Sequence, residues 1–308
     1  MKILVTGGAG YLGGLLVPRL LEAGHDVRVV DSLVYGVHSL FHVCAAPGFD
    51  FVYGDARDER LMAEMVPWAD VILPLAAVVG LAACARDPWL AESTNLDAVR
   101  LVDRLRSPEQ LVVFPSTNSG YGTRAGECTE ETPQEPLSLY ARTKVVAEQE
   151  LLESGSTITL RLATVFGISP RMRLDLLVNH FVYAAVTDGF LVVFEKQFRR
   201  NYIHVRDVAD CFLHCVDNAD RMLGRPFNVG NDAANLTKEQ LARKVQEYVP
   251  EFYVHYAEVR EDPDKRDYDV SSRRLQAAGF APRRSLDDGI RELLKGYRML
   301  GRPPLKNH

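Results

Sequence analysis

Several features that define whole classes of proteins are missing from this chain of 308 residues. No apolar stretch approaches the roughly 18–20 residues of a membrane-spanning helix. Lysine and arginine together number 36 against 41 acidic residues, a net charge of −5 without any long basic run. Neither nucleic acid nor a membrane is therefore expected as a partner. Met1 and Lys2 lead directly into an apolar run at residues 3–5, so we expect no secretory signal.

Cysteine is also scarce and scattered. The chain has five, an odd number, and none of them forms a Cys-x-x-Cys pair. Neither a zinc site nor a disulfide framework is predicted, no metal is expected, and a reducing cytoplasmic compartment fits. Cys211 and Cys215 share one face of a predicted helix, where core packing is the expected role.

The remaining composition is that of an ordinary globular protein, and its apolar residues follow two alternating periodicities. Short apolar runs of strand length alternate with helix-like segments in the first half, which predicts a parallel sheet covered on both faces. The predicted strands are 2–6, 27–30, 51–53, 71–73, 111–114 and 158–162, and the predicted helices include 58–66, 89–106 and 137–153. After residue 167 the pattern loosens, and the tail from about 235 reads as two helices separated by an extended, charged stretch.

A glycine-rich loop, Thr-Gly-Gly-Ala-Gly-Tyr-Leu-Gly at residues 6–13, joins the first predicted strand to the first helix. This context is that of a dinucleotide-binding turn. Gly7 permits the tight turn, Gly10 lets the backbone approach a diphosphate, and Gly13 allows the helix to pack closely on the strand. The start of the helix offers unpaired N–H groups to the phosphates.

Two carboxylates follow at the ends of the next strands. Asp31 ends the second strand, 18 residues after Gly13, where it can accept hydrogen bonds from ribose hydroxyls and would repel a 2′-phosphate. NAD is therefore favoured over NADP. Asp55 ends the third strand and could reach the adenine edge, although a structural capping role is a strong alternative for it.

A catalytic pattern occupies the middle of the chain. Tyr140 and Lys144 lie four residues apart on a predicted helix, and therefore on one face. A tyrosine titrates near pH 10, and a nearby lysine cation, together with an oxidised nicotinamide, would lower its pKa toward neutrality. Ser116 and Thr117 directly follow the fifth strand, at the sheet edge where open α/β folds bind ligands.

Together these residues resemble the nucleotide-sugar epimerase/dehydratase branch of the extended short-chain dehydrogenase/reductase family, over nearly the whole chain. The resemblance also includes Tyr121-Gly122, Arg161-Leu162, the segment 200–209 and Phe-Asn-Val-Gly at 227–230. It implies a Rossmann-type, doubly wound α/β domain with a smaller, partly discontinuous substrate lobe. The expected division is 1–166 for the NAD-binding domain, with 201–230 returning to it, and 167–200 plus 231–308 for the substrate lobe.

The resemblance also implies residue roles. Thr117, Tyr140 and Lys144 would be catalytic: Tyr140 takes a proton from a sugar hydroxyl, usually at C4, while hydride passes to NAD. The expected cofactor-binding residues are Gly7, Gly10, Tyr11, Leu12, Gly13, Asp31, Ser32, Leu33, Asp55, Ala56, Leu75, Ala76, Ala77, Asn95, Ser116, Tyr140 and Lys144. The expected substrate-binding residues are Thr117, Asn118, Asn179, Arg200 and Arg266. His204 is expected to be structural, and the segment 169–175 is expected near the sugar nucleotide.

Departures from the family pattern exclude some of the reactions that members of the family catalyse. The 4,6-dehydratases carry Thr-Asp-Glu where this chain has Thr117-Asn118-Ser119, and neutral side chains cannot act as the acid and base for removing water. A 3,5-epimerase needs a further acid/base pair, for which Cys128, expected in a loop, is a remote candidate. We therefore expect a C4 epimerase of nucleotide-diphosphate sugars. A C4 oxidase or 4-ketosugar reductase is the alternative, and a non-catalytic NAD-sensing protein is a remote one. A homodimer or dimer of dimers, formed through the helices at 89–106 and 137–153, is implied by resemblance alone.

Overall fold

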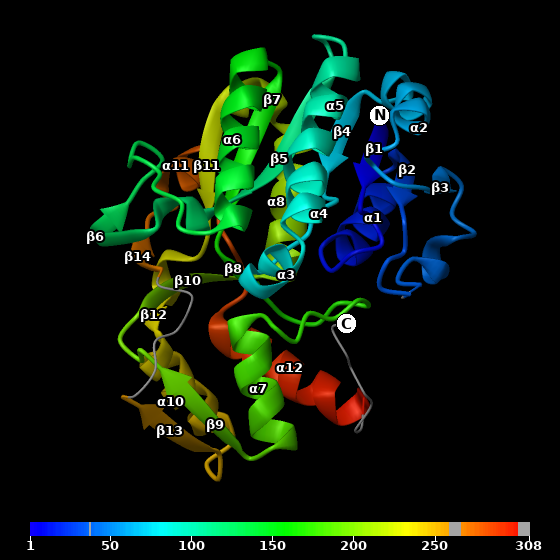
Figure 1. Ribbon diagram of the computed structural model, residues 1–308. Coiled ribbons are helices and arrows are strands. Elements are labelled where there is room, and N and C mark those ends of the chain that lie inside the picture. Colours follow the sequence, from blue (N-terminus) through cyan, green and yellow to red (C-terminus); the bar gives the residue numbers. More distant parts are fainter. Residues whose placement is uncertain (37, 259–265, 301–308) are drawn as a thin grey trace.

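A computed structural model describes residues 1–36, 38–258 and 266–300 of the chain (Figure 1). Its centre is a sheet of seven strands in the order β11-β7-β5-β4-β1-β2-β3, all parallel. The predicted doubly wound parallel sheet is thus confirmed. The strands are β1 (Lys2–Thr6), β2 (Asp26–Asp31), β3 (Phe49–Tyr53), β4 (Val71–Pro74), β5 (Leu111–Thr117), β7 (Thr157–Leu162) and β11 (Arg225–Val229).

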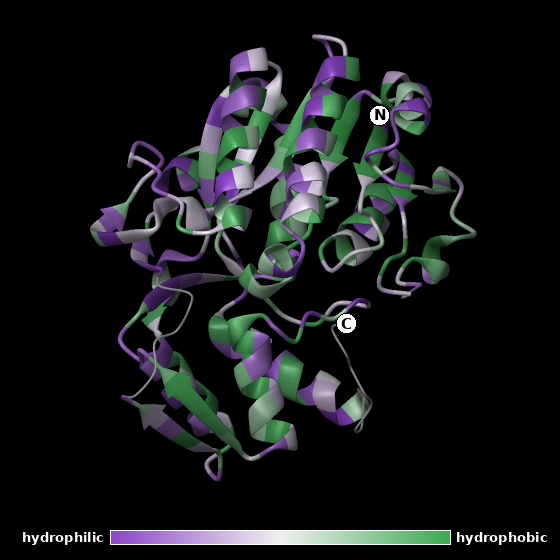
Figure 2. Ribbon diagram, in the orientation of Figure 1, coloured by the Kyte–Doolittle hydropathy of each residue, from purple (hydrophilic) through white to green (hydrophobic). Residues whose placement is uncertain are grey.

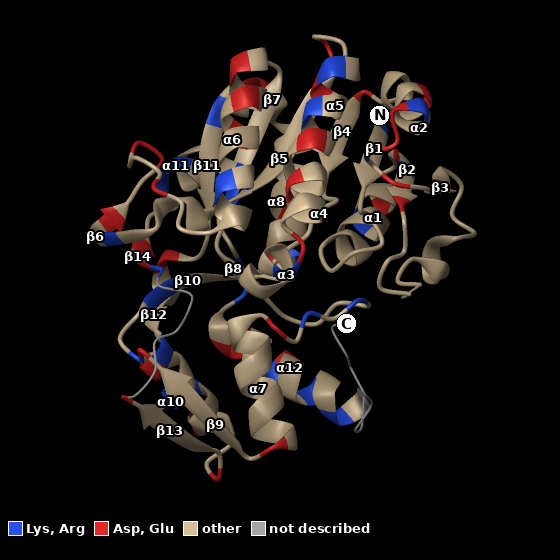
Figure 3. Ribbon diagram, viewed as in Figure 1, with Lys and Arg blue, Asp and Glu red and all other residues tan. Residues whose placement is uncertain are grey.

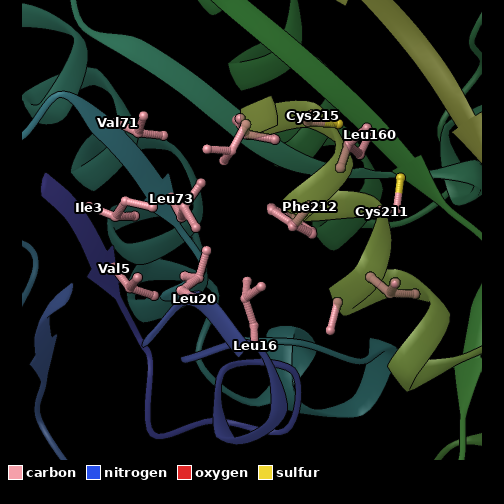
Figure 4. Close-up of a cluster of buried hydrophobic side chains, with 14 of the residues drawn as sticks. Ile3, Val5, Leu16, Leu20, Val71, Leu73, Leu160, Cys211, Phe212 and Cys215 are labelled. Atoms are coloured by element: carbon pink, nitrogen blue, oxygen red, sulfur yellow. The ribbon is translucent and has the colours of Figure 1, made fainter. Parts of the chain in front are cut away.

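Helices cover both faces of this sheet because successive strand residues point to opposite sides. Ile3 and Val5 of β1 belong to one buried cluster, whereas Leu4 between them belongs to another. The first cluster lies under α1 (Gly13–Glu22) and α8 (Val205–Asp217), as Figure 4 shows for side chains of both helices and of the strands beneath them. The second lies under α2 (Glu59–Met65), α5 (Ala98–Leu105) and α6 (Leu139–Ser154).

A second group of elements forms its own apolar cluster below the carboxyl ends of the central strands (Figures 1 and 2). It contains α7 (Leu177–Thr187), α10 (Lys238–Tyr248), α12 (Leu286–Leu300) and the paired strands β9 (Phe190–Phe194) and β13 (Tyr253–Ala257). A three-stranded sheet links the two groups: β8 (Thr164–Phe166), β10 (Arg199–His204) and β12 (Asn235–Thr237). The shorter helices are α3 (Leu81–Arg86), α4 (Pro88–Glu92), α9 (Ala219–Met222) and α11 (Arg273–Ala277).

The structure confirms the predicted helix 89–106 and corrects two other local predictions. This helix runs through α4, a π-helical turn at Ser93–Asp97 and α5 without interruption. Cys128 lies at the end of strand β6 (Thr123–Cys128), paired with β14 (Asp267–Val270), and not in a loop. The described part of the tail holds three helices, α10, α11 and α12, together with β13 and β14, because these strands pair with segments distant in sequence. The prediction for Cys211 and Cys215 is confirmed, since both are buried on α8.

Two negative findings concern the described residues alone. None of their helices has both the length and the apolar composition that crossing a membrane requires. Nor does any group of three or more His, Cys, Asp and Glu residues within them lie close enough together to hold a metal ion.

Candidate active site

The glycine-rich loop lies where the strand order reverses. From β1 the chain continues through β2 to β3 on one side, and then returns to β4 on the other side of β1. The carboxyl ends of β1 and β4 therefore flank the crevice in which open α/β sheets bind ligands. Gly7 directly follows β1 with a φ of +70°, and its N–H donates to the Val30 carbonyl at 2.8 Å.

The structure shows why residues 7 and 13 are glycines: a side chain at either position would collide with nearby backbone. A Cβ atom on Gly7 would lie 2.6 Å from the Ala76 backbone, and one on Gly13 would lie 2.2 Å from the Gly8 carbonyl oxygen. A Cβ on Gly10 would meet only the Gly7 oxygen, at 3.1 Å, so its outer side is open. The loop therefore fits the diphosphate of a dinucleotide, which would accept hydrogen bonds from the backbone at the start of α1.

Asp31 ties this loop to the end of β2. Its carboxylate accepts from Ala9 N–H at 2.9 Å and from Leu33 N–H at 2.8 Å, one bond to each oxygen. Each oxygen retains a further acceptor position, which fits a pair of ribose hydroxyls. Asp55 is more heavily engaged: the Arg57 guanidinium hydrogen-bonds to it at 2.6–3.1 Å and lowers the pKa of this carboxyl. Its role at the adenine remains a prediction.

Asn95 holds in place the backbone segment 75–78, which follows β4 and lies beside the glycine-rich loop. Its amide accepts from Val78 N–H at 2.7 Å and donates to the Val78 carbonyl at 2.9 Å, so it holds the backbone after Ala77 on both sides. The π-helical turn brings Asn95 to this position, and such turns are frequent at functional sites. Another predicted cofactor residue, Leu75, donates its N–H to the Thr6 carbonyl at 2.9 Å. This bond keeps the segment after β4 against the glycine-rich loop.

The catalytic candidates lie on α6 and at the end of β5. Ser138 caps α6 by accepting from Ala141 N–H at 3.1 Å, and Tyr140 and Lys144 follow on the first turns of the helix. Thr117 ends β5, accepts from Ser119 N–H at 3.1 Å and donates to the Ser119 hydroxyl at 2.9 Å. Its hydroxyl also lies near enough to Tyr140 to lower the pKa of that phenol, so the two side chains are neighbours, and their catalytic roles stay predictions.

The pKa shifts of Tyr140 and Lys144 differ from the expectation that a lysine cation lowers the pKa of the tyrosine. Burial raises the pKa of Tyr140, and the charges that oppose this rise belong to Arg173 and Arg266. Lys144 is only 2% exposed, and its ammonium nitrogen lies 4.1 Å from the centre of the Phe114 ring. Burial lowers the pKa of Lys144 to about 7, so near neutrality a large share of it carries no charge that could act on the tyrosine.

Several polar atoms beside Thr117 are buried without a hydrogen-bond partner among the described residues. They are the Ser116 hydroxyl oxygen and both amide atoms of Asn118. Buried polar groups of this kind require an explanation, and a bound ligand is one. The same end of β5 therefore offers donors and acceptors to a polar ligand.

The predicted substrate residues fall into two groups. Arg266 donates to the Ser119 hydroxyl and lies close enough to Tyr140 to affect its pKa, so it borders the catalytic pair. Arg200 is buried and donates to the Arg199 carbonyl at 2.8 Å, with its guanidinium 6.0 Å from the Tyr268 ring centre. Asn179 binds Gly167 N–H, the Tyr11 hydroxyl and the Arg173 carbonyl at 2.9–3.2 Å, and therefore organises the loop 167–175.

Two other motif residues are structural in their surroundings. His204 caps α8 by accepting from Arg206 N–H at 3.2 Å, and its other ring nitrogen contacts Glu292 at 3.1 Å. Cys128 is buried, and burial raises the pKa of its thiol, which does not suit an acid/base role at neutral pH.

Sequence reasoning missed two neighbours of the tyrosine. Arg173 and Cys84 both influence the pKa of Tyr140, and Arg173 is held by Asp175 through a bond of 2.6 Å from Nε. The loop 169–175 was expected near the sugar nucleotide, but no spacing singled out Arg173. Cys84 lies on α3, outside every motif, and no sequence signal could have found it.

The chain is similar to known proteins over nearly its whole length. The chain is 30% identical to UDP-glucose 4-epimerase of Mycolicibacterium smegmatis, with 97% of this chain and 99% of that protein covered. It is 26% identical to UDP-glucuronic acid decarboxylase 1 of Arabidopsis thaliana, covering 97% of this chain and 70% of that one. The dTDP-glucose 4,6-dehydratase DesIV of Streptomyces venezuelae, solved with NAD and TYD bound, superposes with a TM-score of 0.86, covering 99% and 100% of the two chains at 25% identity.

The family assignment rests on most of the chain. Residues 3–230 match the NAD dependent epimerase/dehydratase family, and this segment contains the glycine loop, Asp31, Thr117, Tyr140 and Lys144. The chain therefore belongs to the NAD dependent epimerase/dehydratase family, and NAD is the cofactor of that family.

Proposed function

We propose that this chain is a nucleotide-diphosphate-sugar epimerase that inverts C4 of the sugar through a transient 4-keto sugar. The observation that carries the proposal is the proximity of Thr117 and Tyr140 at a sheet edge whose adjacent side chains, Asn118 and Ser119, are neutral. The side chains that most affect Tyr140 by charge are Arg173, Cys84 and Arg266, none of them a carboxylate. This set can move a hydroxyl proton but lacks the acid/base pair for eliminating water.

The mechanism assigns one task to each group. When bound, NAD supplies the acceptor and later the donor of the hydride at C4. Thr117 orients the C4 hydroxyl toward Tyr140, whose phenolic oxygen takes the proton and later returns it. Lys144, on the same face of α6, would hold the nicotinamide ribose. Its charged fraction, together with the positive ring of bound NAD, would lower the pKa of Tyr140 and favour the phenolate that takes the proton. Arg200 and Arg266 hold the substrate diphosphate through charge-assisted hydrogen bonds.

Relatives that act on UDP-sugars guide the first assay. The purified chain is incubated with UDP-glucose or UDP-glucuronic acid in heavy water, without added cofactor, and products are followed by proton NMR. Inversion at C4 with no deuterium at any ring carbon supports the proposal, because the hydride then returns to the carbon that it left. Deuterium at C3 or C5, loss of carbon dioxide, or a product lacking water would contradict it.

Two variants separate an enzyme from a binding protein. Tyr140→Phe removes the proton-transfer oxygen, and we expect turnover to fall by about 10²-fold or more with NAD binding retained. Tyr53→Phe removes the hydroxyl of an exposed tyrosine on β3 and is expected to leave both unchanged. Stoichiometric NAD on the purified protein would favour the epimerase. Consumption of added NAD in proportion to product would favour the C4 oxidase.

We further propose a homodimer, or a dimer of dimers, that works in the cytoplasm. The five cysteines are all free thiols, which suits a reducing compartment. The outer side of α5 and α6 carries the exposed ion pair between Arg100 and Glu150, so a partner chain there would meet a polar surface. Light scattering during gel filtration measures the assembly.

A further inference from the structure

Arg171 is a buried arginine that forms no ion pair with a carboxylate in the described part of the chain. It is 6% exposed, and no ion pair joins it to any acidic side chain in the ranges 1–36, 38–258 and 266–300. Arg173, two residues further on, is instead paired with Asp175. The charge of Asp175 also acts on Arg171, but its carboxylate is bound by Arg173. A buried guanidinium with no ion pair of its own is unfavourable, and an anionic ligand would supply the missing partner.

The guanidinium of Arg171 lies over the ring of one side chain from the other lobe. Its central carbon is 3.7 Å from the centre of the Tyr35 ring. Tyr35 follows Asp31 by four residues and is 47% exposed, so it forms the outer side of this contact. The contact therefore joins the loop after β2 to the loop after β8.

Both loops are anchored on the glycine-rich loop. Ser169 donates to the Tyr11 carbonyl at 2.6 Å, and Tyr11 donates its hydroxyl to the Gly167 carbonyl at 2.7 Å. From the other side Ser39 donates to the Ala9 carbonyl at 2.8 Å. The segment 167–175 thus lies against Tyr11 in the glycine-rich loop, and its basic residues, Arg171 and Arg173, follow after this contact (Figures 1 and 3).

These contacts hold both loops beside the glycine-rich loop, where a diphosphate would bind. We propose that Arg171 binds the diphosphate of NAD from the side opposite the glycine loop, and that Arg171 and Tyr35 form a clasp that opens to release the dinucleotide. This inference rests on the dinucleotide site of the proposed function. It assigns to the segment 167–175 a role in cofactor retention, whereas the sequence placed that segment near the sugar nucleotide.

The clasp explains how an epimerase could keep its cofactor through many turnovers. A guanidinium suits two phosphate oxygens at once, and the tyrosine ring covers the guanidinium on its solvent side. A reductase that exchanges NAD at every turnover would be slowed by such a contact.

The test compares cofactor binding by three variants. Arg171→Met keeps the apolar stem and removes the charge, Arg171→Lys restores the charge, and Arg221→Met removes one charge from an exposed site on α9. Fluorescence titration with NADH, at two salt concentrations, gives the dissociation constant of each. We expect Arg171→Met to weaken binding by about 10- to 100-fold and to reduce its salt dependence. Arg171→Lys should recover part of the loss, and Arg221→Met should match the parent chain.

A chase experiment tests the tyrosine. With Tyr35→Leu we expect bound NADH to leave at least about tenfold faster than from the parent chain, a difference measured by displacement with excess NAD. An Arg171→Met variant that binds NADH like the parent chain overturns the inference. If its KM for the sugar nucleotide rises instead, Arg171 serves the substrate diphosphate. A parent chain that binds neither NAD nor NADH would instead overturn the proposed function.

Discussion

The buried ion pair beneath the catalytic helix gives the sharpest prediction about stability. Glu148 lies on α6, one turn beyond Lys144, and is 1% exposed. Its carboxylate accepts from Arg161 at 2.8 Å and 2.7 Å, and Arg161 also donates to the Tyr121 hydroxyl and the Glu130 carbonyl, each at 3.0 Å. Glu148→Gln keeps the shape of the side chain but leaves the guanidinium without a counter-charge.

The expected loss is large because the remaining charge stays buried. Breaking one partner of a buried pair costs about 3–5 kcal/mol, against a total stability of about 5–15 kcal/mol for a typical domain. Glu247→Gln is the control, since Glu247 lies on α10, away from the proposed dimer helices, and pairs with Lys244 at 2.9 Å in an exposed position. An exposed pair contributes less than about 1 kcal/mol.

Urea unfolding at a fixed NAD concentration measures both variants. Equal losses of unfolding free energy from Glu148→Gln and Glu247→Gln would refute the reasoning, because burial would then not decide the cost. The double variant Glu148→Gln, Arg161→Met gives a further check. We expect it to lose less free energy of unfolding than the sum of the two single variants, since the second change removes the unpaired charge.

Two further predictions concern the site. Burial lowers the pKa of Lys144 from 10.5 to about 7, so between these pH values the unfolded chain binds more protons than the folded one. The free energy of unfolding should therefore rise with pH across this window in the parent chain and less so in Lys144→Met, and parallel curves from urea titrations would contradict this. Gly13→Ala would place a methyl group 2.2 Å from the Gly8 carbonyl oxygen, whereas a Cβ on Gly14 meets nothing closer than 3.4 Å. We expect NADH binding to weaken about tenfold or more in Gly13→Ala but little in Gly14→Ala, and similar affinities would contradict the close-packing explanation.

The central sheet could be predicted because its signals are local. Each strand of the doubly wound sheet is a short apolar run, and the glycine loop, Asp31 and the Tyr140–Lys144 pair lie at fixed positions relative to strands and helices. The small strands could not be predicted in the same way. β6 pairs with β14, more than one hundred residues away along the chain, and this pairing depends on how the lobes fold together.

The same limit applies within the site. Arg173 and Cys84 affect Tyr140 from separate segments, and neither has a spacing that points to the tyrosine. From the sequence, the only influence that can be read for Tyr140 is the charge of Lys144 and of the nicotinamide, which predicts a lowered pKa. In the structure burial is the larger cause, and burial is set by packing that no local motif records.

The position of α8 has a consequence for synthesis on the ribosome. This helix packs against α1, and Arg19 of α1 donates to the Arg206 carbonyl of α8 at 2.7 Å. The apolar cluster on this face of the sheet is therefore completed only when residues 205–217 join α1 over it, and the edge strand β11 is made later still. Until that length has emerged, the side of the cluster that α8 covers stays exposed, and such apolar surface is prone to aggregation. A chain truncated before residue 205 would lack the means to close its largest core.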